Sequence, residues 1–111
     1  MKAIALDQLP QEGVSHNPQI RKRVMLRRGE LPHLANFSQA RFAPGDVANA
    51  HAHDNMWEVF FVESGQGVIC VDGRDQPLTA GVCVSVEPGE RHEVANTGTV
   101  DLVITYFGIN A

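Results

Sequence analysis

The chain has 111 residues, a length that allows a single domain with one hydrophobic core. Apolar residues make up 43% of it and charged residues 20%, a composition typical of folded globular proteins and not of disordered segments. The formal net charge is −4, and no apolar run approaches the roughly 20 residues that a bilayer-spanning helix needs. These totals exclude a membrane-spanning helix and a second domain.

The chain also lacks the signals of a secreted protein. Its opening apolar stretch is interrupted by the charge of Asp7, which is too early for a secretory signal. The two cysteines, Cys70 and Cys83, are too few for a disulfide framework, and we expect both to be reduced. We therefore predict a cytoplasmic protein.

Five of the nine basic residues lie close together, and the rest of the chain is acidic: Arg21, Lys22, Arg23, Arg27 and Arg28. Such a cluster can bind phosphate or an acidic ligand, and a solvated strand is the alternative. The segment has no interleaved aromatic residues, and the domain as a whole is not positively charged. The sequence therefore predicts neither a nucleic-acid partner nor a membrane partner.

Residues 1–33 are predicted to form an N-terminal leader and an arm strand. Proline, glycine and asparagine punctuate the beginning of this segment, which indicates irregular structure with one short strand at Ala3–Leu6. Loose alternation over residues 20–28 predicts the arm strand. His16 and His33 lie in turn-rich surroundings, and we interpret both as surface residues.

Residues 34–111 are predicted to form one all-β domain, a double-sheet barrel of the jelly-roll type, because short strand patterns recur with turn signals between them. The predicted strands are Leu34–Phe42, Trp57–Val62, Val82–Val86, His92–Asn96 and Leu102–Phe107. Ser64–Gly67 and Val71–Arg74 are predicted hairpin turns, the second because Asp-Gly accepts positive φ angles. The alternation does not decide which face of Leu34–Phe42 points inward.

The clearest chemical signal lies in the middle of the chain. His51 and His53 are two residues apart, so on a strand both imidazoles point to the same side. A turn at Asp54-Asn55 would bring the carboxylate of Glu58 back over them from the next strand. Two imidazoles and a carboxylate predict a metal site, and His92, which opens a later strand, is the best further ligand.

These residues resemble the cupin family over about residues 34–107. The first cupin motif is matched at every fixed position, by Gly45, His51, His53, Glu58 and Gly65. The second motif is matched by Gly81, Gly89, His92 and Asn96. Its proline is displaced by one position to Pro88, which concerns turn geometry and leaves the ligand positions intact. We expect Asn96 to serve the turn that follows it.

The resemblance implies a cupin-type double-stranded β-helix in a small single-domain metal-binding protein. It implies one divalent transition metal per chain, of the group Fe, Mn, Ni, Zn and Co, with these ligands: His51, His53, Glu58 and His92. Four protein ligands leave two octahedral positions open, and one carboxylate leaves a formal charge of +1. Both features favour a small oxygen-rich or anionic ligand.

Three functions remain open, because cupins perform many reactions. The first is a metalloenzyme acting on a small oxygen-rich or anionic metabolite by oxygenation, isomerisation or elimination. The second is a metal-containing small-molecule binding module without turnover. The third, a structural or storage role, agrees least with an intact ligand set. No acid or base for catalysis stands out in the sequence.

Residues whose side chains point to the same side of their strands as the metal ligands are expected to line a pocket. Phe60, Val62 and Val94 have this facing. Tyr106 can place a hydroxyl near the metal, or it can be a core tyrosine with a satisfied hydroxyl. Arg41 can hold a substrate carboxylate through two hydrogen bonds, or it can be an exposed strand arginine.

The sequence also predicts a homodimer. Trp57, Phe61, Ile69 and Val71 face away from the ligands, and together they would form an exposed apolar patch. A second copy would bury this patch, and the strand Ile20–Leu26 would extend the partner's sheet. The alternative is that the leader folds back over its own barrel.

Overall fold

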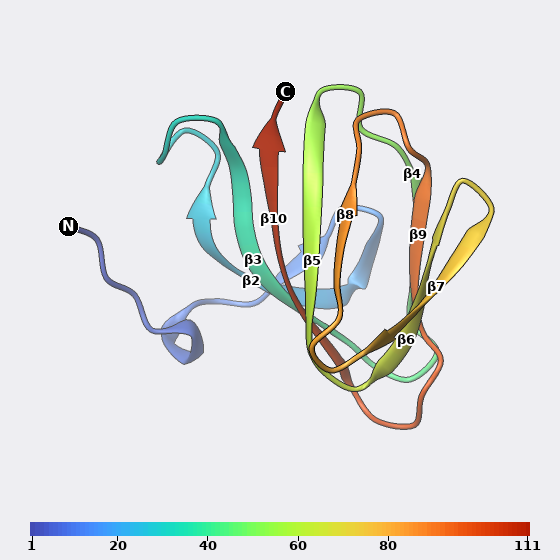
Figure 1. The fold of residues 1–111 in the computed structure, drawn as a ribbon. Helices are drawn as coiled ribbons and strands as arrows, with labels where there is room; N and C mark the ends of the chain where they lie inside the picture. Colours follow the sequence, from blue (N-terminus) through green and yellow to red (C-terminus); the bar gives the residue numbers. More distant parts are fainter.

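The computed structural model describes all 111 residues and contains ten strands in two antiparallel sheets (Figure 1). The strands are β1 (Glu12–Val14), β2 (Asn17–Arg27), β3 (Leu34–Phe42), β4 (Val47–His51), β5 (Met56–Ser64), β6 (Gln66–Val71), β7 (Arg74–Thr79), β8 (Cys83–Val86), β9 (His92–Asn96) and β10 (Leu102–Asn110). One sheet has the order β1-β2-β3-β10-β5-β8, and the other has the order β4-β9-β6-β7. The predicted all-β double-sheet fold is confirmed. No helix in the structure is long and apolar enough to cross a membrane.

Two of the predicted turns have the expected backbone geometry. Asp72 and Gly73 both have positive φ angles, 48° and 80°, and they join β6 to β7 as a tight hairpin. Gly65, which links β5 to β6, has φ of 89°, and a Cβ atom at this position would collide with the carbonyl group of Asp101. A motif glycine is therefore required here by both conformation and space.

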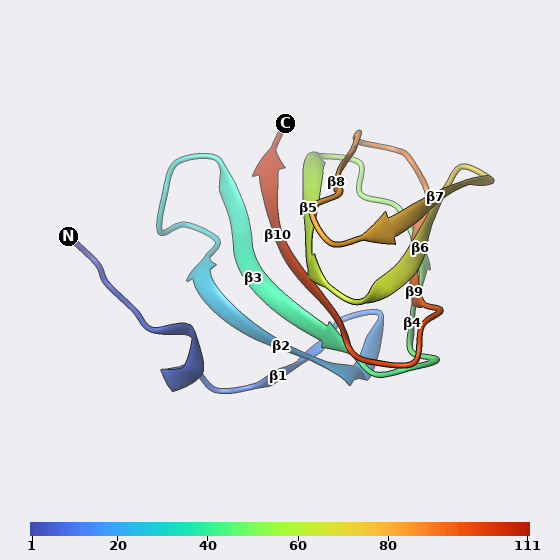
Figure 2. The same ribbon diagram turned by 60° about the horizontal axis from the view of Figure 1, so that its bottom comes forward.

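The N-terminal segment differs from the prediction. Ala3–Leu6 is not a strand, and the first regular element is a single 3-10 turn at Leu6–Gln8. β2 begins at Asn17, earlier than predicted, because Pro18 lies where the β1–β2 register shifts and no ladder bond is needed from it. Figure 2 shows β1 and β2 continuing the larger sheet beyond β3.

The arm strand pairs within its own chain, since β2 runs along β3 of the larger sheet; its extension of a partner's sheet stays a prediction. Ile20, on the inner face of β2, is completely buried in the common core. The N-terminal arm therefore contributes to the hydrophobic core of the same barrel. This burial gives it a stabilising role that its sequence pattern alone did not indicate.

The core lies between the two sheets and contains 13 buried apolar residues from both of them. Ile69 belongs to this core, opposite Val94 in the β6–β9 ladder, and Val71 packs against it, so the expectation that both face outward is wrong. The prediction took odd and even positions along β5 as a guide to which side chains point inward. β6 lies in the other sheet, so that alternation does not carry over to Ile69 and Val71. Cys70 and Cys83 are free, as expected.

Candidate metal centre

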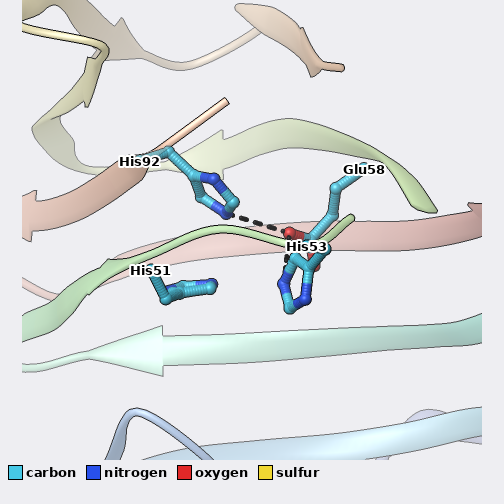
Figure 3. A group of neighbouring side chains, drawn as sticks. All are labelled: His51, His53, Glu58 and His92. Atoms are coloured by element: carbon cyan, nitrogen blue, oxygen red, sulfur yellow. Dashed lines mark hydrogen bonds and ion pairs between the residues drawn. The ribbon is translucent and has the colours of Figure 1, made fainter. Parts of the chain in front are cut away.

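Four side chains from three strands and a loop converge inside the barrel (Figure 3). His51 is the last residue of β4, His53 follows in the loop, Glu58 lies near the start of β5, and His92 opens β9. One potential ligand atom from each residue lies within 4.8 Å of those of the other three. This is the set of residues that the sequence motifs single out.

Backbone pairing explains how residues so far apart in sequence meet. β4 and β9 are antiparallel neighbours, and their ladder places His51 directly opposite His92. The loop that carries His53 is fixed because its carbonyl oxygen accepts a hydrogen bond of 2.7 Å from the backbone N–H of Gly89. Gly89 lies in the turn just before β9, so the β8–β9 turn positions two of the four side chains.

Glu58 is a carboxylate held in the barrel interior with imidazoles as its neighbours. Only 6% of Glu58 and 1% of His92 is exposed to solvent. The Oε1 atom of Glu58 lies 3.1 Å from Nε2 of His92 and 3.5 Å from Nε2 of His53. A buried carboxylate requires a cation or hydrogen-bond donors, and here the imidazoles are the groups that can supply them.

The rings of two histidines are oriented by backbone carbonyl groups. Nδ1 of His51 lies 2.7 Å from the carbonyl oxygen of Asn49, and Nδ1 of His92 lies 3.1 Å from that of Glu90. A carbonyl oxygen can only accept, so in each ring Nδ1 carries the proton and donates it. Nε2 is then the ring atom available to a metal, and the carbonyl group fixes its direction, as is usual for histidine ligands.

The protonation of the site agrees with these contacts. Burial, followed by the neighbouring imidazoles, lowers the pKa of His51 to about 4, so this ring is neutral at neutral pH. Burial also acts to lower the pKa of His92, but the hydrogen bond and charge of Glu58 outweigh it, and the pKa is raised. The contact with Glu58 thus favours the protonated form of His92.

The residues present fit a divalent first-row metal. Neutral imidazole nitrogens and a carboxylate oxygen are suitable donors for Fe, Mn, Ni, Zn or Co. In an octahedral site, four such donors leave two positions for other ligands. The donor atoms already lie within 4.8 Å of one another, so the chain brings them together without a bound metal.

The cluster forms part of the wall of a cavity of about 110 Å³ with a mainly hydrophobic lining. Three of the five predicted pocket residues line this cavity: Phe60, Val94 and Tyr106. Val62 has the expected facing but is completely buried in the core away from the cavity. Arg41 points to the outer face of the larger sheet, where its Nη1 lies 3.9 Å from Asp101.

His16 also lines the cavity, and its interpretation as a surface residue is wrong. Its ring stacks on His51 with centroids 3.5 Å apart and an interplanar angle of 13°. The side chain of Asn49 donates a 2.9 Å hydrogen bond to the carbonyl oxygen of His16, and Asn17 donates one of 3.0 Å to Val47. These bonds attach the β1–β2 turn to β4. No local sequence signal indicates this long-range contact.

Lys22 is another lining residue that was not predicted to reach the pocket. It lies on β2 opposite Ala40 of β3, and both residues line the cavity. The alternation along β2 places Lys22 on the face of the buried Ile20, whereas Arg21 and Arg23 lie on the opposite face. This alternation was a usable signal, but the run of basic residues concealed it.

Comparison with known proteins agrees with the fold. The family model of the cupin domain matches residues 38–108. The oxalate-binding protein of Thermotoga maritima is 33% identical over 66 residues, which is 60% of this chain and 54% of that protein. The alignment thus spans only about half the length of this relative.

Solved structures show the same architecture. The crystal structure of a predicted oxalate decarboxylase from Thermotoga maritima has a TM-score of 0.92 and 23% identity, covering 99% of this chain and 100% of that one. KdgF from a Halomonas species has a TM-score of 0.82 and 18% identity, covering 100% and 96%. At these identities the likeness shows the fold and leaves the chemistry to be argued from the site.

Proposed function

The chain belongs to the cupin domain family, and from this we propose that it binds one divalent first-row metal and, at that metal, a small carboxylate anion. The observation that carries the proposal is the convergence of four donor atoms within 4.8 Å in the wall of a cavity. The ligands proposed are His51, His53, Glu58 and His92. A bound divalent cation would supply a Lewis acid with two open positions for oxygen ligands.

Charge and size support a small anion as the cavity's ligand. Glu58 is the only carboxylate in the lining, so a divalent cation would leave the centre with a formal charge of +1. The cavity volume of about 110 Å³ is below the roughly 300 Å³ at which drug-sized ligand pockets begin. The name of the Thermotoga maritima relative, oxalate-binding protein, supplies a compact carboxylate to test first.

The remaining lining residues would orient such an anion and keep water away from it. Phe60, Val94 and Ile104 form an apolar wall, which lowers the local dielectric constant and strengthens each polar contact in the cavity. Tyr106 also lines the cavity, and its ring stacks on Phe60 with centroids 5.9 Å apart. Its hydroxyl group can donate a hydrogen bond to an anion in the cavity.

A metal-dependent enzyme acting on the same anion is the second candidate, and Tyr106 is the observation that favours it. Burial, followed by the charge of Glu58, raises the pKa of Tyr106 to about 12, so the hydroxyl keeps its proton at neutral pH. A positioned proton donor is what an acid-catalysed step requires. The test is to incubate the metal-loaded protein with oxalate and to follow oxalate concentration. Consumption that is absent in Tyr106→Phe would support turnover, whereas constant oxalate would leave binding alone.

The binding proposal is tested by metal analysis followed by titration calorimetry with oxalate. We expect one metal ion per chain and oxalate binding that disappears after the metal is chelated. His92→Ala should lose both, while His33→Ala, at an exposed position outside the cavity, should keep both. Equal oxalate binding with and without metal, or full metal content in His92→Ala, would contradict the proposal.

We also propose that the chain forms a homodimer through the outer face of the larger sheet. A row of apolar side chains crosses four neighbouring strands in register, through Leu26, Phe37, Phe107 and Val59. Trp57, Phe61 and Ile109 extend the row, and each is 41% exposed. Such a sheet face can pair with its own copy across a two-fold axis, which would remove this surface from water.

A further inference from the structure

Lys22 is a lysine on the inner face of a strand that lines the metal cavity. Its neighbours on that face of β2 are Ile20, which is completely buried, and Val24, which is half-buried. Its cross-strand neighbour Ala40 is 2% exposed and lines the same cavity. Apolar neighbours do not stabilise the charge of a half-buried lysine, because an ammonium group removed from water needs an anionic or hydrogen-bonding partner.

The chain itself does not supply such a partner. The Nζ atom of Lys22 forms none of the hydrogen bonds or ion pairs within the protein. Glu12 faces Lys22 across the β1–β2 ladder, but its carboxylate is bound by the guanidinium group of Arg27. Glu58, the cavity's carboxylate, contacts His53 and His92 instead. Lys22 thus lines both the cavity and the groove beside Arg21 and Arg41, and it makes no ion pair, although its charge also helps to lower the pKa of Glu12.

The cavity contains a further polar atom that the chain leaves without a partner. The side-chain oxygen of Asn36 is buried and makes no hydrogen bond, and Asn36 lines the cavity. Buried polar atoms in folded proteins are nearly always satisfied, so such an atom in a cavity wall indicates a polar occupant. Two independent features therefore point to a ligand that is polar beyond its contact with the metal.

We propose that Lys22 selects dianionic ligands by binding a carboxylate oxygen that remains free when other oxygens of the same anion occupy the open positions at the metal. This inference rests on the proposed metal-dependent anion binding and adds to it the class of ligand. With a divalent cation, Glu58 and Lys22 together give the cavity a formal charge of +2, which a small dicarboxylate neutralises. A monocarboxylate would leave the ammonium group of Lys22 unpaired.

The position of Lys22 places the proposed selection outside the segment that the family model matches. The family model matches residues 38–108, and Lys22 lies outside that segment, as do Val14, Ser15 and His16. All four residues reach the cavity through β1, β2 and the turn between them. The N-terminal arm therefore supplies most of the lining outside the matched segment, and Asn36 of β3 supplies the rest.

The test compares oxalate with acetate on the metal-loaded protein by titration calorimetry. A hydrogen bond between charged groups predicts a loss of roughly 10- to 100-fold in oxalate affinity for Lys22→Met. Acetate affinity should change by less than about 2-fold, and Lys22→Arg should retain most of the oxalate affinity. Arg41→Met is the matched control, because it removes a cation from the same sheet on the outer face, and it should leave both affinities unchanged.

The acetate measurement separates a direct contact from a general effect of charge. A long-range field acts on a dianion about twice as strongly as on a monoanion, so a 2-fold loss for acetate would accompany only about a 4-fold loss for oxalate. A loss of that smaller size, or no loss, in Lys22→Met would overturn the assignment of Lys22. If Lys22→Met fails to fold, Lys22→Gln keeps a polar side chain and is judged by the same criterion.

Failure of the proposed metal-dependent anion binding would give a different result from failure of the inference about Lys22. If the metal-loaded wild-type protein binds neither oxalate nor acetate, the proposed anion binding itself is wrong, and the role of Lys22 is overturned with it. If the wild-type protein binds both anions with similar affinity and Lys22→Met leaves them unchanged, only the inference about Lys22 is wrong. Metal content is measured on each variant as a control, and it should equal that of the wild-type protein.

Discussion

Nε2 of His92 and Oε1 of Glu58 lie 3.1 Å apart inside the barrel, and both residues are almost completely buried. The pair comes from different sheets, since His92 opens β9 and Glu58 lies on β5. Protonated His92 is a cationic partner for this carboxylate, whose hydrogen bond and charge raise the pKa of His92 against the effect of burial. A divalent metal would take over this role, so metal binding should displace the proton and link the two sheets.

Glu58→Gln should therefore remove most of the metal affinity. Glutamine keeps the size of the side chain but loses the only negative charge among the four donors. Loss of an outer-sphere partner of a metal ligand typically costs about 10- to 100-fold in affinity, and loss of this ligand should cost more. Equilibrium dialysis followed by elemental analysis measures the effect. Glu63→Gln, at an exposed position on the same strand, is the control and should bind metal normally; equal affinities in the two variants would show that Glu58 is not a ligand.

Tyr106 gives a prediction at alkaline pH. Its pKa in the folded protein is raised to about 12, whereas an unfolded tyrosine ionises near pH 10. Between about pH 10 and 12 the unfolded chain releases a proton that the folded chain keeps, so the free energy of unfolding should fall as pH rises. The contribution of Tyr106 to this fall is at most about 1.4 kcal/mol per pH unit.

The composition of the chain allows a direct measurement of this shift. Tyr106 is the only tyrosine, so tyrosinate absorbance of the metal-free protein reports on this residue alone. The midpoint should lie near 12 in the folded protein and near 10 in urea, and Tyr106→Phe should abolish the signal. A midpoint near 10 in the folded protein would mean that the hydroxyl group is not buried beside the charge of Glu58.

Substitution of Asn96 should lower the stability of the fold without removing a candidate metal ligand. Its amide nitrogen donates hydrogen bonds of 2.9 Å to the carbonyl oxygens of Phe42 and Val100, and its amide oxygen accepts one of 2.8 Å from Gly98. Asn96 is 3% exposed, so Asn96→Ala leaves buried groups unsatisfied and should cost about 3 kcal/mol of unfolding free energy. Urea denaturation measures this cost. Asn55→Ala, at an exposed position, should stay within about 0.5 kcal/mol of the wild type.

The convergence of the four candidate ligands and the architecture could be predicted because their signals are local or fixed in spacing. The interval from His51 to Glu58 and the Asp72-Gly73 turn are short enough for the pattern to determine the geometry. Asn96 has the predicted role, since its side chain bonds to Val100 and Gly98 in the turn that follows. Such features depend little on the rest of the fold.

The remaining lining residues could not be predicted because they depend on pairing between distant strands. His16 reaches His51 only because the β1–β2 turn is attached to β4 by hydrogen bonds from Asn17 and Asn49. The facing of Ile69 depends on the second sheet, whose side-chain parity is independent of β5. The position of Arg41 depends on which face of β3 points inward, and the sequence alternation along β3 is compatible with either face. In each case the pairing of distant strands determines where the side chain points, and the local sequence pattern does not.

The outer face of the larger sheet gives the prediction for the oligomeric state. Phe37 and Phe107 are paired in the β3–β10 ladder with ring centroids 6.3 Å apart, and Val59 is the next neighbour across β10. Trp57 and Ile109 are also paired in register and are both 41% exposed. The apolar surface is thus continuous across the sheet rather than scattered, which is typical of a surface that binds another protein.

Light scattering should accordingly give a mass of twice the 12.1 kDa of one chain at micromolar concentration. Trp57→Lys places a charge within the apolar face and should convert the dimer to a monomer, because a buried lysine at a two-fold interface would lack a partner. Val100→Lys is the matched control, since Val100 is exposed but lies in the β9–β10 turn outside this face, and its dimer should persist. A wild-type monomer at this concentration would exclude the dimer. A Trp57→Lys protein that remains dimeric would place the interface on another surface of the barrel.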